Sequence, residues 1–150
     1  MRPYAEGDRA FSVAFLGDAE VFKHAAGGHL SPERASALFD KIAPIYREGR
    51  FAIWLVEEGG RPVGHAELKP RAGEEGLELV YFLAREAQGR GLGTELVGAL
   101  VRHGLTETKR LLATVHPDNA RSVKVLEKAG FAFLRREEHE DGATLYFERR

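Results

Sequence analysis

Apolar residues recur at helical spacing in two early stretches of the chain, and this pattern predicts two helices before any strand. Asp8 is expected to cap the first helix, which ends near Leu16. Ser31-Pro32-Glu33 begins the second, with a capping serine, a proline at the first helical position and an acid beside the positive end of the dipole. Pro44 is expected to kink or end this second helix.

The middle of the chain has the composition of strands. Residues 51–57 read FAIWLVE, and the sequence EGGR at residues 58–61 supplies a tight turn into residues 63–68, so a hairpin is expected. After a polar loop, residues 77–84 read LELVYFLA. This apolar run is typical of a central strand buried on both faces.

The second half of the chain alternates strands with helices. The further elements are, in order, a helix, a strand, a helix and a hairpin, at residues 91–103, 110–115, 119–129 and 131–148. Gly104 and Gly130 are expected to end the two helices, and Asp118 or Asn119 caps the second. No repeat or linker interrupts this order, so we predict one mixed α/β domain over residues 1–150.

Composition narrows the function. With a formal net charge of −1 the chain has none of the excess positive charge that nucleic-acid binders usually carry, so nucleic acid is not an expected partner. It has no cysteine, which excludes disulfides, thiolate catalysis and cysteine-based zinc sites and favours a cytoplasmic location. There is no signal-peptide core and no apolar run long enough for a membrane span, so no membrane is expected either.

The stretch REAQGRGLGTEL carries the strongest chemical signal. Gly89, Gly91 and Gly93 lie between the apolar run and the following helix, where the first backbone N–H groups are unpaired and glycine allows an anion to approach closely. Arg90 adds a full positive charge. The alternative is that the glycines only form a tight turn. The spacing fits neither the Gly-Lys-Ser/Thr ending of nucleotide hydrolases nor the Rossmann fingerprint of dinucleotide-dependent oxidoreductases.

The turn from Gln88 to Gly93 matches Gln/Arg-x-x-Gly-x-Gly/Ala, and here the chain resembles the GNAT superfamily of N-acetyltransferases. A second stretch, HPDNARSVKVLEKAGF at residues 116–131, is similar to the RimJ/RimL-like branch, which acetylates ribosomal-protein N-termini. The resemblance covers nearly the whole chain. It departs at the start, where almost nothing precedes Arg2-Pro3 to form the family's first strand, so that strand is either very short or truncated.

The resemblance implies a GNAT-type α/β fold: a mixed, largely antiparallel central sheet with helices on both faces and splayed central strands. It also implies acetyl-CoA as cosubstrate, with no metal, and direct attack of an amine on the thioester. The residues implied in coenzyme binding are Tyr81, Phe82, Leu83, Gln88, Gly89, Arg90, Gly91, Leu92, Gly93, Thr94, Asn119 and Ser122.

By the same resemblance Glu78, on the central strand, is the expected general base. The alternative is that Glu78 only ends the polar loop or pairs with an arginine. The tyrosine that many members use to protonate the leaving thiolate is replaced by Leu126, so Ser122 is the expected acid and Tyr146 a second candidate. His116 is an alternative base, although a histidine at a strand end is more often structural.

The acceptor is expected to be a protein N-terminal α-amine or a small-molecule amine. At pH 7 roughly 10–15% of an α-amine is neutral against ~0.04% of a lysine side chain, so an α-amine needs less catalytic help. A homodimer is left open. A non-catalytic acyl-CoA-binding or sensory module is the competing interpretation, which Leu126 favours. His24 and His29 alone make a weak metal site, and His65 is expected to pack within a strand.

Overall fold

The computed structural model describes residues 1–25, 27–47, 52–140 and 142–150, so Phe51 and Asp141, which belong to the two expected hairpins, lie outside the described residues. The chain divides into two compact units. The first comprises Met1–Glu67 and Tyr81–Gln88, and the second comprises Leu68–Val80 and Gly89–Arg150.

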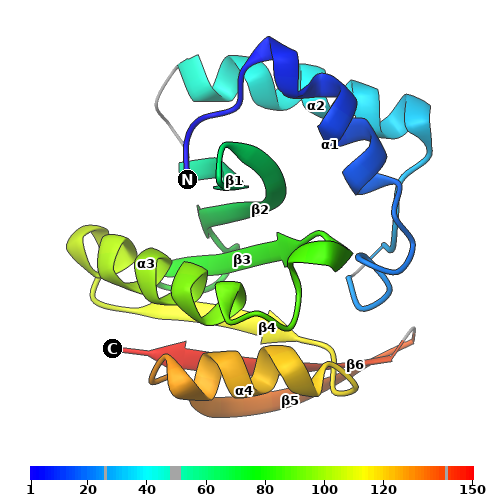
Figure 1. Ribbon diagram of the computed structural model, residues 1–150. Coiled ribbons are helices and arrows are strands. Elements are labelled where there is room, and N and C mark those ends of the chain that lie inside the picture. The colour runs from blue at the N-terminus through cyan, green and yellow to red at the C-terminus, as the bar shows by residue number, and fades with distance from the viewer. Residues whose placement is uncertain (26, 48–51, 141) are drawn as a thin grey trace. The chain divides into compact units, whose positions relative to one another are not determined.

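The helices and strands follow the predicted order (Figure 1). In chain order they are η1 (Glu6–Asp8), α1 (Arg9–Leu16), α2 (Pro32–Arg47), β1 (Ala52–Glu58), β2 (Arg61–Pro70), β3 (Leu77–Leu83), η2 (Arg85–Ala87), α3 (Leu92–Glu107), β4 (Leu111–Val115), α4 (Ala120–Lys128), β5 (Ala132–His139) and β6 (Gly142–Arg149).

The strands form a mixed sheet in the order β1-β2-β3-β4-β6-β5. β3 pairs with β4 in parallel, whereas β6 is antiparallel to both β4 and β5. The expected mixed, largely antiparallel sheet is therefore confirmed. Near the N-terminus, Arg2 and Leu55 form an isolated antiparallel bridge, in which they exchange N–H···O bonds of 3.1 and 2.9 Å.

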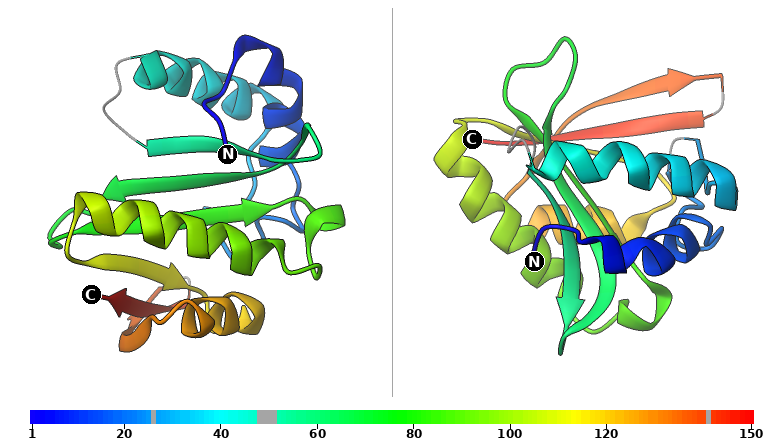
Figure 2. Two further views of the ribbon diagram at one scale, coloured as in Figure 1. Left: turned by 60° about the vertical axis from the view of Figure 1, so that its left-hand side comes forward. Right: turned by 90° about the horizontal axis from the view of Figure 1, so that it is seen from above.

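In the second unit, α3 and α4 contact each other and β4, and both helices lie on one face of its strands (Figures 1 and 2). Leu100, Leu111 and Leu126 are fully buried there. A Cβ added to Gly104 of α3 would meet Leu111 Cδ2 at 2.7 Å, so α3 covers the face of β4 to which Leu111 points. By strand alternation, Leu112 and Thr114 point to the opposite face.

Three expectations about helix ends were wrong or incomplete. α3 does not end at Gly104 but continues to Glu107, because this glycine serves the close approach to Leu111 rather than a left-handed cap. α2 extends past Pro44 to Arg47. Asp8 precedes α1 as expected, but its side chain accepts no hydrogen bond from that helix and turns back to the N-terminal segment.

Asp8, which is buried, forms a charge pair with the partly exposed Arg2 in the first unit. Its carboxylate accepts hydrogen bonds from Arg2 Nη1 at 2.7 Å, Arg2 Nη2 at 2.8 Å and the Ala5 N–H at 2.6 Å. The bonds from Arg2 lower the pKa of Asp8 below its usual value. Because this pKa is depressed in the folded chain, the stabilisation is present above the unfolded-state pKa and is lost as the pH falls through the folded-state pKa.

Replacing Asp8 by asparagine is therefore expected to lower the free energy of unfolding at pH 7 by about 1.5–3 kcal/mol, the range for hydrogen bonds to a charged group. Urea unfolding at pH 7, 4 and 2.5 would measure this. The difference between variant and wild type should shrink as the pH falls below about 4. Asp40→Asn, which removes an exposed carboxylate paired with Arg9, is the control and should leave stability unchanged. A pH-independent loss in Asp8→Asn would contradict the assignment.

Candidate active site

The two central parallel strands diverge after two paired residues. Leu77 pairs with Leu111 and Glu78 with Leu112. Among the described residues of the second unit, Leu79 and Val80 have no partner on β4. The splayed central strands expected from the sequence are thus present, and Glu78 is the last paired residue before the divergence. At Leu79 and Val80 the backbone N–H and C=O groups therefore do not pair with β4, and backbone groups outside a ladder can bond a ligand.

Glu78 is buried, with 5% of its surface exposed. Arg71 Nη1 donates to its Oε1 at 2.6 Å, and Thr114 Oγ1 donates to the same oxygen at 2.8 Å. The pairing with an arginine, which the sequence left open as an alternative, is therefore observed. It balances the charge of the carboxylate, while Oε2 makes neither contact.

Tyr146 lies on the same face as Glu78 and Thr114, because it is the Cα partner of Thr114 in the β4–β6 ladder. Its hydroxyl accepts a hydrogen bond from Arg71 Nη2 at 3.1 Å, and the Arg135 guanidinium carbon lies 4.0 Å from its ring centroid. Only 4% of Tyr146 is exposed, and burial raises the pKa of its phenol. The tyrosine is therefore a neutral hydroxyl at neutral pH.

Sequence reasoning missed Arg71 and Thr114. Thr114 carries the only hydroxyl in the strand LLATV, and a polar residue at an otherwise buried position was a usable signal. Arg71 lies in the polar stretch KPRAGEEG, where nothing local distinguishes it from a solvated side chain.

The glycine turn leads directly into α3. Gly89 and Gly91 have φ values of +77° and +86°, and Gly91 is the N-cap residue of the helix. The Thr94 N–H donates to the Gly91 carbonyl at 3.0 Å, so the first-turn N–H groups that remain for a ligand are those of Leu92 and Gly93. A Cβ at Gly89 or Gly91 would meet no atom within 4 Å, which means that the backbone conformation, not crowding, requires glycine there.

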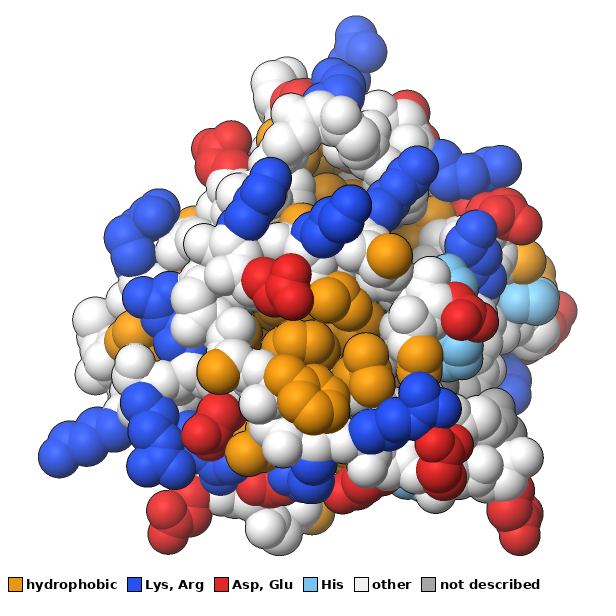
Figure 3. Space-filling model, turned by 90° about the horizontal axis from the view of Figure 1, so that it is seen from below, with side chains coloured by type: hydrophobic (Ala, Val, Ile, Leu, Met, Phe, Trp, Pro, Cys, Tyr) orange, Lys and Arg blue, Asp and Glu red, His pale blue; other side chains and the backbone are white. Residues whose placement is uncertain are grey.

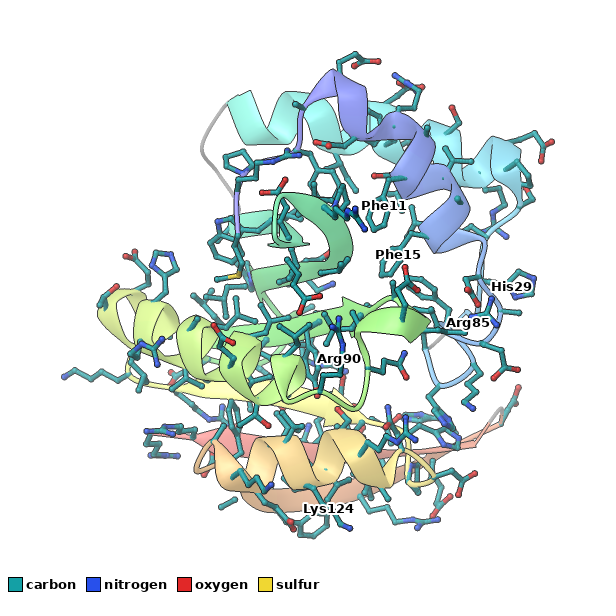
Figure 4. The ribbon with its side chains drawn as sticks, viewed as in Figure 1. Phe11, Phe15, His29, Arg85, Arg90 and Lys124 are labelled. Atoms are coloured by element: carbon teal, nitrogen blue, oxygen red, sulfur yellow. The ribbon has the colours of Figure 1, made fainter. Side chains whose placement is uncertain are left out.

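Arg90 lies within this turn (Figure 4). It directly precedes Gly91, the N-cap residue, and a positively charged residue and the positive end of the α3 dipole both favour a bound anion. In the first unit, the side chain of Gln88 donates to the Leu83 carbonyl at 2.9 Å. That bond ties the residue before the glycines to the end of β3.

The start of α4 matches the prediction. Asn119 is the N-cap residue, and its side chain accepts a hydrogen bond from the Ser122 N–H at 3.2 Å. Ser122 therefore lies in the first turn of α4, a helix that packs against β4 on the side of α3. Glu78 and Tyr146 lie on the other face of the strands.

In the first unit, Phe82 of β3 belongs to an aromatic cluster. Phe22 stacks on Phe82 with ring centroids 4.5 Å apart, and Phe15 contacts Phe22 edge-on at 5.4 Å. Phe11 and Phe15 extend from α1 (Figure 4). Arg85 donates to Asp18 at 3.0 Å, so the segment after α1 is fixed to the end of β3 by stacking and by a salt bridge. Tyr81, Phe82 and Leu83, the expected pantetheine-binding residues, lie on this strand.

Two of the histidines named above, His116 and His65, form hydrogen bonds with nearby residues. His116 Nδ1 accepts a hydrogen bond from the Asp118 N–H at 3.2 Å, within the turn before α4. His65 is buried in β2, with Tyr4 Oη at 2.8 Å from Nδ1 and Glu67 Oε1 at 2.7 Å from Nε2. Within the described ranges, His24 and His29 join no group of three metal-ligating side chains.

Charges of both signs are interspersed over the face drawn in Figure 3, around a group of hydrophobic side chains. Several acids are held by arginines: Glu74 accepts from Arg135 at 2.6 Å, and Glu148 accepts from Arg110 at 2.8 Å. No helix in the part of the chain that the structure describes is long and apolar enough to cross a membrane.

Comparison with known proteins gives a consistent result. Residues 1–132 match the family described as "Acetyltransferase (GNAT) domain". The uncharacterized N-acetyltransferase YnaD of Bacillus subtilis (strain 168) is 28% identical over 125 residues, which cover 82% of this chain and 71% of that protein. Aminoglycoside N(6')-acetyltransferase type 1 of Klebsiella pneumoniae is 25% identical over 162 residues, covering 97% and 80%.

Solved structures show the same fold. A GNAT-family acetyltransferase from Bacillus anthracis has a TM-score of 0.83 at 21% identity, covering 99% of this chain and 92% of that one. Aminoglycoside acetyltransferase AAC(6')-Ib in complex with coenzyme A and kanamycin has a TM-score of 0.78 at 21% identity, with the same coverage. The ribosomal-protein-alanine N-acetyltransferase of Brucella melitensis has a TM-score of 0.77 at 23% identity, covering 99% and 97%.

Proposed function

The chain belongs to the GNAT acetyltransferase family, and from this we propose that residues 1–150 act as one domain that transfers acetyl from acetyl-CoA to a primary amine. The observation that carries the proposal is the divergence of β3 from β4 at Glu78, in the same unit as a glycine turn that opens a helix. The pantetheine arm of acetyl-CoA, which carries the thioester, needs backbone groups that are not used in the sheet. The diphosphate of the coenzyme needs unpaired N–H groups.

The residues present fit the coenzyme. The N–H groups of Leu92 and Gly93, the positive end of α3 and Arg90 suit a diphosphate. The proposed coenzyme-binding set further includes Gln88, Gly89, Gly91, Thr94, Asn119 and Ser122, together with the main chain of Tyr81, Phe82 and Leu83. Bound there, acetyl-CoA supplies an acetyl group activated as a thioester.

Glu78 is the proposed general base. The amine nitrogen forms a bond to the acetyl carbon as the carbon–sulfur bond breaks, and the proton that the amine loses passes to Glu78 directly or through one water. Arg71 and Thr114 both hold Oε1. Oε2 is therefore the oxygen that would take the proton.

Ser122 is the proposed donor of the proton that the departing thiolate takes up. It lies on the α4 side of β4, whereas Glu78 lies on the opposite face, so base and acid would act from the two sides of the diverging strands. A thiol with a pKa near 8.5 is a tolerable leaving group, so replacing Ser122 should lower turnover by about one order of magnitude rather than abolish it. Tyr146 is the alternative donor.

The acceptor is proposed to be a protein N-terminal α-amine or a small-molecule amine. The pattern around Asn119 and Ser122 and the likeness in fold to a ribosomal-protein-alanine acetyltransferase support the RimJ/RimL-like branch. The curated relative that acts on aminoglycosides supports a small molecule. A cytoplasmic location is proposed from the absence of cysteine.

Two measurements on the wild-type protein test this proposal. Calorimetry with coenzyme A should detect binding. A free-thiol assay with acetyl-CoA should then show release that depends on an added amine, drawn from N-terminal peptides, polyamines and aminoglycosides. Binding without thiol release from any amine would favour the non-catalytic, sensory alternative, and no binding would overturn the proposal.

A further inference from the structure

A row of polar side chains crosses the strands of the second unit on the face opposite α3. Glu78, Thr114, Tyr146 and Arg135 occupy neighbouring positions on β3, β4, β6 and β5, because Thr114 pairs with Tyr146 and Tyr146 pairs with Arg135. Arg71, which follows β2, bonds to both Glu78 and Tyr146. We call these five residues the polar row.

The guanidinium of Arg71 has more hydrogen-bond donors than its two partners use. A guanidinium has five N–H groups. One is used by Glu78 and one by Tyr146, so within the described ranges three of the five have no partner. The side chain of Arg71 is 31% exposed, whereas that of Glu78 is 7% exposed. A group that approaches Glu78 along this face therefore also meets a guanidinium that can donate.

We infer that the Glu78–Arg71 pair selects acceptors whose amine stands beside a carbonyl or carboxylate oxygen, that is, the α-amine of a peptide or amino acid. The inference rests on the proposed function, in which Glu78 receives the amine's proton. A carboxylate oxygen and a guanidinium N–H in direct contact are complementary to an amine and to a carbonyl oxygen on the carbon next to the one that carries the amine. Arg71 is thus a specificity-determining residue.

The charges on this face argue against a polycation. Arg71 and Arg135 are the more exposed members of two of its ion pairs, at 31% and 37%, against 7% for Glu78 and 16% for Glu74. A ligand with several ammonium groups needs carboxylates that are accessible and not already neutralised. Glu137, an acid beside this row that is 38% exposed, is already paired with Arg135 at 2.7 Å, so this face has little to attract an aminoglycoside.

The test compares kcat/KM for two acceptors that differ in one group on the carbon that carries the amine, in wild type and in Arg71 variants. In alaninamide this group is a carboxamide, whose carbonyl can accept a hydrogen bond, and in isopropylamine it is a methyl group. Their different basicities cancel when the ratio for a variant is divided by the ratio for wild type. Arg71→Gln should reduce the preference for alaninamide by about tenfold, the size of one charge-assisted hydrogen bond, and Arg71→Lys should restore part of it.

Arg102→Gln removes an exposed arginine of α3 and is the matched control, for which the ratio should not change. In wild type, kcat/KM should be higher for alaninamide than for kanamycin. An unchanged ratio in both Arg71 variants, or a wild-type preference for kanamycin, would overturn the inference and leave acetyl transfer intact. Calorimetry with coenzyme A separates the failure of this inference from the failure of the proposed function. If wild type does not bind coenzyme A, the proposed function itself is overturned.

Discussion

Replacement of Glu78 by glutamine is expected to lower kcat/KM for acetyl transfer by about 10²- to 10³-fold at pH 7, within the range for loss of a general base. The glutamine keeps the size of the side chain and can still accept from Thr114, but it cannot take a proton. The loss should be greatest where the amine is protonated. For an α-amine with a pKa near 8, the ratio of wild-type to variant activity should shrink above about pH 9.

Thiol release measured between pH 6 and pH 10 would provide this profile. Glu74→Gln is the matched control, since Glu74 is likewise a largely buried carboxylate held by arginines, Arg135 and Arg110, and is not among the residues proposed to bind or react. It should retain activity within about twofold. Parallel profiles for wild type and Glu78→Gln would remove Glu78 from the mechanism. Thermal unfolding of both variants would show whether loss of an arginine's partner lowers activity through stability alone.

Replacement of Gly91 by alanine is expected to raise the Kd for coenzyme A by about tenfold or more. Gly91 has φ of +86°, and an L-residue there costs about 1–2 kcal/mol. The chain can relieve this strain only by changing the turn that orients the first N–H groups of α3. About 1.4 kcal/mol corresponds to a tenfold change in affinity. The cost of holding alanine in the conformation that binds the coenzyme therefore accounts for the expected effect.

Gly60→Ala is the control for strain, because Gly60 lies in the β1–β2 turn with φ of +78° and, as at Gly91, no atom within 4 Å of an added Cβ. Both variants should lose similar stability in urea unfolding. Only Gly91→Ala should lose coenzyme affinity in calorimetry. Equal stability losses with unchanged coenzyme affinity in Gly91→Ala would show that this turn does not hold the diphosphate.

Local sequence rules predicted most of the elements. Asn119 caps α4 and Ser31 precedes α2, because a short polar side chain before an amphipathic stretch satisfies the first N–H groups wherever it occurs. The glycine turn before α3 was readable for the same reason, since only glycine adopts positive φ without cost. These signals act over four residues or fewer.

Expectations failed where packing overrides local preference. Gly104 has the residue type of a helix end, yet the helix continues because the position requires the absence of a Cβ against Leu111. Asp8 has the residue type of a cap, yet two bonds to Arg2 hold its carboxylate away from α1. In both cases a contact with another element stabilises the chain more than the local signal does.

By itself the sequence determined the order of helices and strands, the glycine turn and the candidacy of Glu78. The surroundings of Glu78 were decided only by the tertiary structure. Thr114 is 36 residues from Glu78, and Tyr146 is 75 residues from the Arg71 that joins them. Strand pairing brings these positions onto one face of the sheet, and which residues become neighbours depends on the pairing of strands that lie far apart in the chain, which signals of a few residues do not give.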